Sequence, residues 1–236
     1  MTEDASATGG TATVRDTAGP RLRAALGAVL IGFVGLLGLT VVVLTARHGS
    51  VPPVDRAAHA WSLHHRPPSF TAVARAVTAT GTGVFPYIAA VAAGLTAGRD
   101  LRDRLGYATG ALVFLLIGQG LRYALMEMIS RPRPAVGDWA THASGFAFPS
   151  GHATTSALMA GVLVAAIRYR AHRRGDRGTT RVAAVLLGCW AVAVGLSRVL
   201  LGVHWVTDVL AGWLFAALWL GLGAALIRTM SFPARS

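Results

Sequence analysis

The chain has 236 residues, of which 53% are hydrophobic and only 14% charged, and its mean hydropathy is +0.53. This composition lies outside the range of ordinary soluble proteins and is typical of an integral membrane protein. The net charge of +12 does not indicate nucleic-acid binding, because the chain shows no soluble basic module with stacking aromatic residues.

Six apolar segments are candidate membrane spans, since crossing about 30 Å of hydrocarbon takes roughly 20 helical residues. They cover residues 24–46, 84–98, 105–128, 152–167, 182–196 and 204–227. The second, fourth and fifth are short, so we expect their ends to extend into polar flanks that neighbouring helices bury. We predict an all-α polytopic membrane protein in which residues 21–230 form a bundle of six transmembrane helices.

The distribution of arginine predicts the orientation of this bundle. With six spans both termini lie on the same side, and that side carries fourteen of the 22 basic residues, all of which are arginines. The positive-inside rule places this side in the cytoplasm of a multi-pass protein of the cell membrane. Residues 1–20 are small and polar and predict a disordered cytoplasmic tail, and residues 231–236 form a second cytoplasmic tail.

Two amphipathic segments follow the first span, at residues 54–63 and 69–77. Each carries its apolar residues on one helical face, which predicts helices that lie in the membrane interface. The second segment has an alternative interpretation as the outer end of the second span, interrupted near Gly81, Gly83 and Pro86. The sequence leaves open whether the second span begins near Ser69 or near Val84.

Three polar clusters lie at the extracytoplasmic ends of the predicted spans: "RPRP" at residues 131–134, "PSGH" at 149–152, and Arg198 with His204 and Asp208. Each alone has an ordinary interpretation, as a basic loop, a capped turn, or a structural hydrogen bond. Ionisable groups within spans are energetically expensive and usually functional. Because several of them meet at one membrane level, we interpret them as one site.

The clusters suit an anion such as phosphate. Ser150 and Gly151 stand at a helix start, where free backbone N–H groups and the positive end of the helix dipole favour negative charge. Arg131 or Arg133, together with Arg198, offers planar donor pairs that match phosphate oxygens. The residue types therefore predict a phosphate-binding site.

Two histidines supply the chemistry that such a site requires. His204 and Asp208 are four residues apart and meet on one helical face. The carboxylate can hydrogen-bond one imidazole nitrogen and leave the other free as a nucleophile. His152 provides a second imidazole, which can protonate a leaving group.

The "PSGH" motif followed by "SRVLLGVHWVTD" resembles the type 2 phosphatidic acid phosphatase superfamily of membrane lipid phosphatases. The third motif of that family is Ser-Arg, five residues, His, three residues and Asp, and residues 197, 198, 204 and 208 fit every position. Its second motif is Pro-Ser-Gly-His, which residues 149–152 match. Six spans with the site on the outer side also agree with the family.

The first motif of the family, Lys, six residues and Arg-Pro, matches only in part. If Arg133 is its arginine the lysine position holds Met126, and if Arg131 is its arginine that position holds Ala124. Arg122 lies one turn before Met126 on the same face, and we hypothesise that it reaches the phosphate instead of lysine. The alternative is that Arg122 pairs with a carboxylate inside the bundle.

The resemblance implies a mechanism in which His204 attacks phosphorus to form a phosphohistidine, Asp208 orients it, and His152 protonates the leaving group and then activates water. It also implies that four groups stabilise the transition state: Arg133, Arg198, Ser150 and the Gly151 amide. No metal or other cofactor is required, and the sequence has no carboxylate cluster of the kind that holds magnesium.

We therefore expect a phosphatase that removes a terminal phosphate from a membrane lipid. Among the substrates of the family an isoprenoid diphosphate such as undecaprenyl diphosphate ranks first, followed by phosphatidylglycerol phosphate and phosphatidic acid. A lipid phosphotransferase and a non-catalytic lipid-phosphate-binding relative remain as alternatives, the latter because of the missing lysine. A carrier or channel is disfavoured because the inner halves of the spans are almost purely apolar. The sequence does not indicate an oligomeric state.

Overall fold

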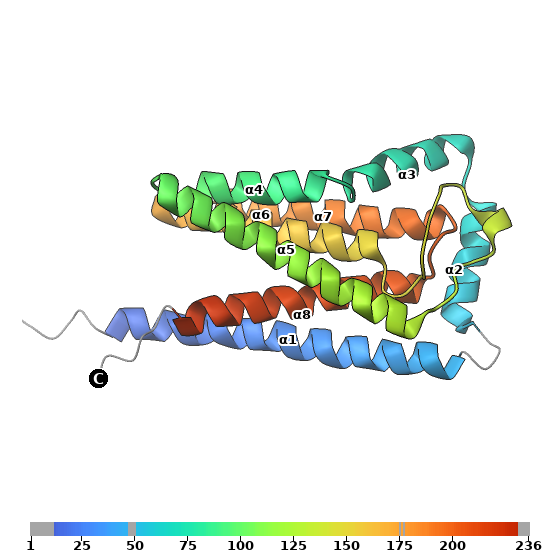
Figure 1. Ribbon diagram of the computed structural model, residues 1–236, viewed down its shortest axis with the longest axis horizontal. Coiled ribbons are helices and arrows are strands. Elements are labelled where there is room, and N and C mark those ends of the chain that lie inside the picture. Colours follow the sequence, from blue (N-terminus) through green and yellow to red (C-terminus); the bar gives the residue numbers. More distant parts are fainter. Residues whose placement is uncertain (1–11, 47–50, 175, 177, 231–236) are drawn as a thin grey trace, which may run out of the picture.

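The structure is a computed structural model that describes residues 12–46, 51–174, 176 and 178–230. Within these residues it contains helices and no strands (Figure 1), as predicted. The helices are α1 (Ala12–Ala46), α2 (Pro53–His64), α3 (Pro68–Thr80), α4 (Phe85–Ala97), α5 (Leu101–Ile129), the 3₁₀ helix η1 (Val136–Asp138), α6 (Gly151–Arg174), α7 (Gly178–Leu200) and α8 (Val206–Met230). Helix α1 begins inside the predicted tail 1–20, and residues 1–11 and 231–236 lie outside the described residues.

The six predicted spans correspond to α1, α4, α5, α6, α7 and α8. Within the described residues, α1 from Gly19 onward, α5, α7 and α8 are long and apolar enough to cross a membrane, and α3 with α4 is a fifth candidate as a bent pair. Helix α6 has 24 residues, but polar residues occupy its first turns and arginines its end. It nevertheless runs inside the bundle, packed against α4, α7 and α8 (Figure 1).

The second predicted span is helix α4, and the amphipathic segment before it forms the separate helix α3. Helices α3 and α4 are bent by 48° at a short break, where Gly83 has a φ of +70°. This left-handed conformation favours glycine, which has no Cβ. Helix α3 continues from α4 toward one end of the bundle and packs against α7 (Figure 1). The structure thus favours the interrupted-span alternative for residues 69–77 over a separate interfacial helix.

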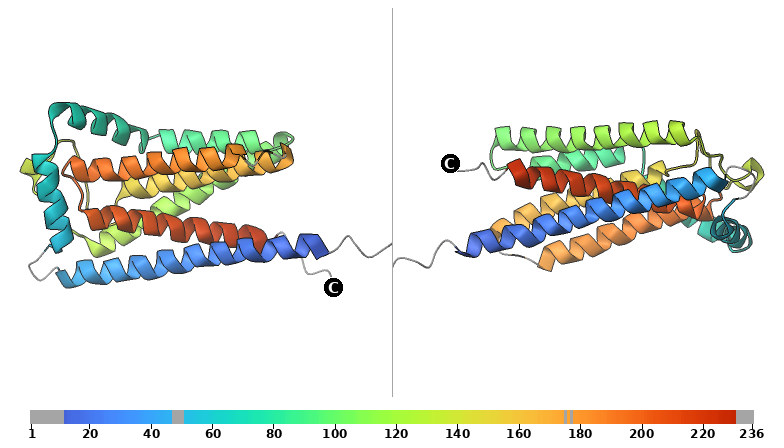
Figure 2. Two further views of the ribbon diagram at one scale, coloured as in Figure 1. Left: turned by 180° about the vertical axis from the view of Figure 1, so that it is seen from behind. Right: turned by 90° about the horizontal axis from the view of Figure 1, so that it is seen from below.

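Helix α2 lies across the end of the bundle, roughly at right angles to the long helices (Figures 1 and 2). Its apolar residues Val54 and Trp61 are 54% and 58% exposed, whereas Asp55 and Ser62 are fully buried. The helix therefore turns its polar face toward the bundle and its apolar face outward. This arrangement suits a helix that rests in the interfacial layer of a membrane, where tryptophan is enriched.

Close backbone packing brings the start of α6 against α8. A Cβ atom at Gly212 would lie 2.8 Å from the Ser150 carbonyl oxygen and 2.9 Å from the Ala153 Cβ. Small residues permit this kind of approach between membrane helices. Along its length α8 also packs against α1, as all three views show (Figures 1 and 2). The glycine at 212 therefore fixes how closely the "PSGH" segment approaches the helix that carries Asp208.

Candidate active site

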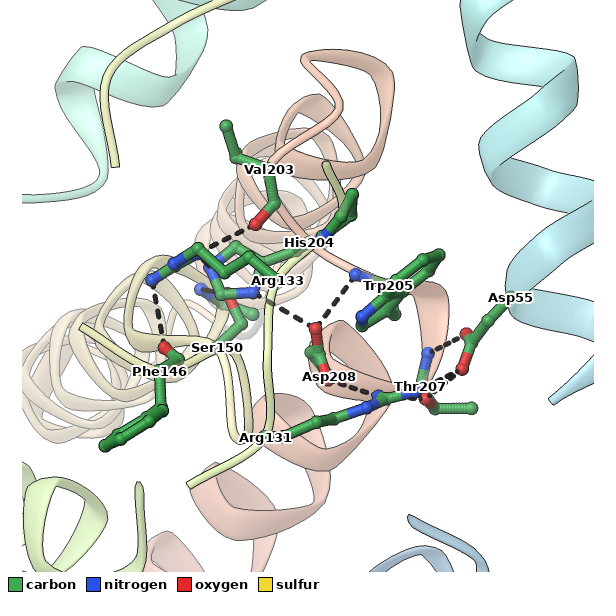
Figure 3. A network of polar contacts seen from close by, with 12 residues as sticks. Asp55, Arg131, Arg133, Phe146, Ser150, Val203, His204, Trp205, Thr207 and Asp208 are labelled. Atoms are coloured by element: carbon green, nitrogen blue, oxygen red, sulfur yellow. Dashed lines mark hydrogen bonds and ion pairs between the residues drawn. The ribbon is translucent and has the colours of Figure 1, made fainter. Parts of the chain in front are cut away.

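The three polar clusters meet at the end of the bundle that α2 covers. They surround a cavity of about 480 Å³, whose lining includes Arg122, Arg133, Gly151, His152, Arg198 and His204. The other lining residues come from α5, from residues 142–146, from the α3–α4 break, and from α4 and α6, which contribute Tyr87 and Thr155. Figure 3 shows the contacts around His204 and Asp208. Six of the nine residues that the sequence predicted for the site thus share one cavity.

His204 lies in the tight link between α7 and α8. The link turns at Gly202, which has a φ of +73° and sits directly against the backbone of Asp138, so that a side chain has no room there. The His204 side chain is almost fully buried, yet it contributes to the cavity wall. The link therefore presents one edge of the imidazole to the cavity and buries the rest.

The hydrogen bonds of His204 determine which ring nitrogen carries the proton. Arg133 Nη1 lies 2.9 Å from His204 Nε2, and because arginine only donates, Nε2 must accept. The proton is therefore on Nδ1, which donates to Asp208 Oδ2 at 3.3 Å (Figure 3). The free lone pair on Nε2 makes that nitrogen the nucleophilic one.

The surroundings of His204 also keep it neutral. Burial, followed by the positive charges of Arg133 and Arg198, holds the pKa of the His204 imidazole well below its ordinary value. A neutral imidazole retains the lone pair that nucleophilic attack requires. The His204 imidazole can therefore act as a nucleophile at neutral pH.

Asp208 is held at both carboxylate oxygens. Oδ2 accepts the Trp205 backbone N–H at 2.8 Å in addition to the His204 proton, and Oδ1 accepts from Arg131 Nη1. A carboxylate in the first turn that bonds back to the preceding backbone N–H is one half of a capping box. Asp208 thus starts α8 and orients His204 with the same side chain.

Arg131 does not line the cavity. Its side chain is buried next to Asp208, where Nη2 donates to Asp55 Oδ2 at 2.7 Å and Nη1 donates to Thr207 Oγ1 at 2.7 Å as well as to Asp208 (Figure 3). The structure therefore separates the two arginines of "RPRP". The sequence predicted that Arg131 could bind the phosphate, but its guanidinium instead pairs with two buried carboxylates, those of Asp55 and Asp208.

Arg133 lines the cavity, and a cradle of neutral backbone carbonyl oxygens surrounds its guanidinium. Its side-chain N–H groups donate to the carbonyl oxygens of Ser144, Gly145, Phe146 and Val203 at 2.8–3.0 Å. Burial lowers the pKa of Arg133, but an arginine keeps its proton in proteins. Because carbonyl oxygens carry no formal charge, the cradle fixes the guanidinium without neutralising it.

Arg198 is a buried cation and Arg122 a half-buried one, and neither forms an ion pair among the described residues. Arg198 Nη1 donates to Thr78 Oγ1 at 3.2 Å, and Arg122 Nη1 approaches the Met126 sulfur at 3.2 Å. The Nε atom of each is buried without a hydrogen-bond partner. Unpaired buried donors are unfavourable, so the cavity is suited to an anion. The alternative that Arg122 pairs with a carboxylate does not match this geometry.

The "PSGH" segment contributes Gly151 and His152 to the cavity wall. A Cβ at Gly151 would meet the Arg122 guanidinium carbon at 3.5 Å, so this cation lies directly over the start of α6. Ser150 is fully buried and is not among the lining residues. Its N–H donates to the Asp208 carbonyl oxygen at 3.0 Å, which joins α6 to α8.

Sequence reasoning missed three residues that support the site: Asp55, Thr78 and Thr207. Asp55 and Thr207 are 152 positions apart in the chain, and Thr78 and Arg198 are 120 apart. No local pattern connects such residues, since each pair forms only when α2 and α3 fold over the end of the bundle. The one available signal was a single acidic residue on the short helix α2.

Comparisons with known proteins identify the family of the chain. The model of the PAP2 superfamily matches residues 107–231. Phosphatidylglycerophosphatase B of Bacillus subtilis (strain 168) is 33% identical over 190 residues, covering 76% of this chain and 86% of that protein. The crystal structure of a transmembrane PAP2-type phosphatidylglycerolphosphate phosphatase from Bacillus subtilis is 27% identical. It has a TM-score of 0.67 and covers 87% of this chain and 99% of the other.

Proposed function

This chain belongs to the PAP2 superfamily, and on that basis we propose that it hydrolyses the terminal phosphate of a membrane lipid through a covalent intermediate on His204 Nε2. The observation that carries the proposal is the position of this lone pair. It lies at the wall of a cavity that also contains Arg122 and Arg198, two cations whose buried Nε atoms have no hydrogen-bond partner within the described residues. A phosphate group provides the missing acceptors.

In the first step, Nε2 attacks phosphorus, the N–P bond forms and the bond from phosphorus to the leaving oxygen breaks. His152 donates its proton to that oxygen. The imidazole becomes cationic, and Asp208, bonded to Nδ1–H, stabilises it. In the second step, His152 takes a proton from water, which attacks phosphorus, releases inorganic phosphate and restores His204.

Arg133 has a specific part in the first step. Its Nη1 donates to the Nε2 lone pair before the reaction, at 2.9 Å. When that lone pair forms the bond to phosphorus, the N–H loses its acceptor and lies beside the transferring phosphoryl group. The same donor then stabilises an equatorial oxygen, where negative charge is concentrated in phosphoryl transfer.

The lining of the cavity favours a lipid as the substrate. Tyr123 lines the cavity and is 54% exposed on the side of the bundle. The cavity thus reaches the lipid-facing surface of α5, where a substrate can insert its phosphate while its acyl chains stay in the bilayer. We place the site on the extracytoplasmic side and both termini in the cytoplasm, from the distribution of arginine.

For the substrate we propose phosphatidylglycerol phosphate, because one of the similar proteins is a phosphatidylglycerophosphatase. This choice places it ahead of undecaprenyl diphosphate, which the sequence alone ranked first. Both present a terminal phosphate to the same groups and differ in what leaves: a lipid alcohol in one case and a lipid phosphate in the other.

The test is a phosphate-release assay on the purified protein in mixed micelles. The substrates are phosphatidylglycerol phosphate, undecaprenyl diphosphate and phosphatidic acid, with wild type and His204→Ala compared. We expect the highest kcat/KM on phosphatidylglycerol phosphate and a loss of at least about a thousandfold in His204→Ala. Acid quenching should trap phosphate on the wild-type protein only.

Other results identify the alternatives. No release from any lipid supports a non-catalytic binding protein, and transfer of phosphate to added glycerol at the expense of release supports a phosphotransferase. Activity retained in His204→Ala contradicts the mechanism.

A further inference from the structure

Among the acidic residues whose burial the structure describes, Asp55 is the most completely enclosed outside the catalytic motifs. It lies in the first turn of α2, and 0% of its surface is exposed. Its Oδ1 accepts the Thr207 backbone N–H at 2.9 Å, and its Oδ2 accepts from Thr207 Oγ1 and Arg131 Nη2, each at 2.7 Å. Figure 3 shows that these contacts lie beside Asp208.

The first consequence concerns the start of α8. The first N–H groups of a helix have no acceptor within the helix, and a side chain just before the helix usually supplies one. Here Asp208 accepts the Trp205 N–H, and Asp55, from a different helix, accepts the Thr207 N–H. Asp55 therefore fixes the turn of α8 that carries Asp208, and the helix dipole favours both carboxylates at this position.

The second consequence concerns charge. Arg131 donates to Asp55 through Nη2 and to Asp208 through Nη1, and all three side chains are buried. If Arg131 faced Asp208 alone, that pair would carry no net charge. With Asp55 present, the three side chains carry one net negative charge next to His204, which becomes cationic when it attacks phosphorus.

We propose that Asp55 is a positioning residue for the nucleophile. It fixes the first turn of α8, and by sharing Arg131 it leaves Asp208 enough negative charge to stabilise the cationic phosphohistidine. This inference rests on the proposed function of His204. It assigns α2, the helix that lies across the end of the bundle, an indirect part in the chemical step, through Arg131, Thr207 and Asp208.

The test compares Asp55→Asn with Asp138→Asn as a matched control. The Asp138 carboxylate pairs with His59 of the same helix α2 at 2.9 Å, so it also attaches α2 to the site, but it does not contact Arg131. Phosphate release from phosphatidylglycerol phosphate and from phosphatidic acid is measured for both variants. We expect kcat to fall about 10- to 100-fold in Asp55→Asn, the scale typical of groups that orient an active-site histidine. We expect KM to stay within about twofold and Asp138→Asn to match wild type in both parameters.

A double variant tests the charge argument. Asp55→Asn with Arg131→Gln removes one negative and one positive charge, which restores the net charge around Asp208. If charge sharing matters, the kcat of this double variant is at least about tenfold higher than that of Asp55→Asn, because the two changes are coupled. If Asp55→Asn does not fold, Thr207→Val serves in its place, since it removes the hydroxyl that bonds to both Asp55 and Arg131; we expect kcat to fall about fivefold.

Three results overturn the inference while the wild type remains active: a kcat of Asp55→Asn within about twofold of wild type, an equal loss in Asp138→Asn, or a rise in KM with kcat unchanged. A kcat of Thr207→Val equal to that of wild type does so as well, and a double variant slower than Asp55→Asn overturns the charge-sharing part. Wild type that releases no phosphate, or His204→Ala that remains active, contradicts the proposed function instead. The two failures are therefore distinguishable.

Discussion

Replacing Arg122 by alanine should remove a cation that the transition state uses and that the folded protein does not need. Within the described residues, the polar contact of its guanidinium is with the Met126 sulfur at 3.2 Å, a weak acceptor. Its Nε is buried without a partner. Since no carboxylate is left unpaired by the substitution, we expect the folded state of Arg122→Ala to be at least as stable as that of wild type.

The size of the catalytic effect follows from the position of the side chain. The Arg122 guanidinium lies over the start of α6 and lines the cavity with His204. Removing one preorganised donor to a developing anion lowers kcat by about 100- to 1000-fold, which corresponds to about 2.7–4 kcal/mol of transition-state stabilisation. We therefore expect kcat/KM of Arg122→Ala to fall at least about 100-fold.

The assay is phosphate release from phosphatidylglycerol phosphate, with the unfolding temperature measured on the same samples. Arg75→Ala is the control: Arg75 is an exposed arginine whose Nε donates to the Ala140 carbonyl oxygen at 2.7 Å outside the cavity. We expect this variant to keep its rate within about twofold. Adding Met126→Lys to Arg122→Ala should recover at least about tenfold, because it places a cation at the position where the family has lysine. A rate for Arg122→Ala within about threefold of wild type would refute the reasoning.

Two further predictions concern stability. Folding holds His204 neutral, whereas an unfolded histidine binds a proton below about pH 6.5. The free energy of unfolding should therefore fall as pH drops below that value, by at most about 1.4 kcal/mol per pH unit from this group. Thermal unfolding in detergent at several pH values should show a shallower dependence in His204→Gln, and an unchanged slope would contradict the assignment. Gly212→Ala should lower the free energy of unfolding by about 1–3 kcal/mol, because its Cβ would lie 2.8 Å from the Ser150 carbonyl oxygen. Gly38→Ala has no neighbouring atom within 4 Å and should show no such loss in the same measurement.

The helical architecture was predictable because membrane spans are determined by local composition. Each of the six apolar segments corresponds to a helix, since a backbone in hydrocarbon must satisfy its own hydrogen bonds. The sequence offered an interruption near Gly81, Gly83 and Pro86 as one of two interpretations, but it could not decide between them, because the bend depends on how α3 packs against α7. The composition of α6 gave the weakest indication of a membrane span, since polar residues that belong to the site occupy its first turns.

The candidate site was predictable only where its residues lie in short motifs. His204 and Asp208 are four residues apart on a helix, and this spacing predicted their contact. The two arginines of "RPRP" could not be ranked, because a loop has no periodicity that determines which side chain faces inward. Their separation depends on Asp55, which lies on α2 and enters the site only in the folded bundle.

Arg131 differs from the three arginines of the cavity in its ion pairs, and this difference explains why the cavity should attract an anion. Arg131 is neutralised by two buried carboxylates, whereas Arg122, Arg133 and Arg198 have no ion pair within the described part of the chain. Unpaired buried charge disfavours folding, so the bundle tolerates a charge imbalance that a dianionic phosphate would relieve. The interaction becomes strongest when negative charge on phosphorus is greatest, which is in the transition state. In the proposed mechanism, the same unpaired charges that oppose folding therefore favour phosphoryl transfer.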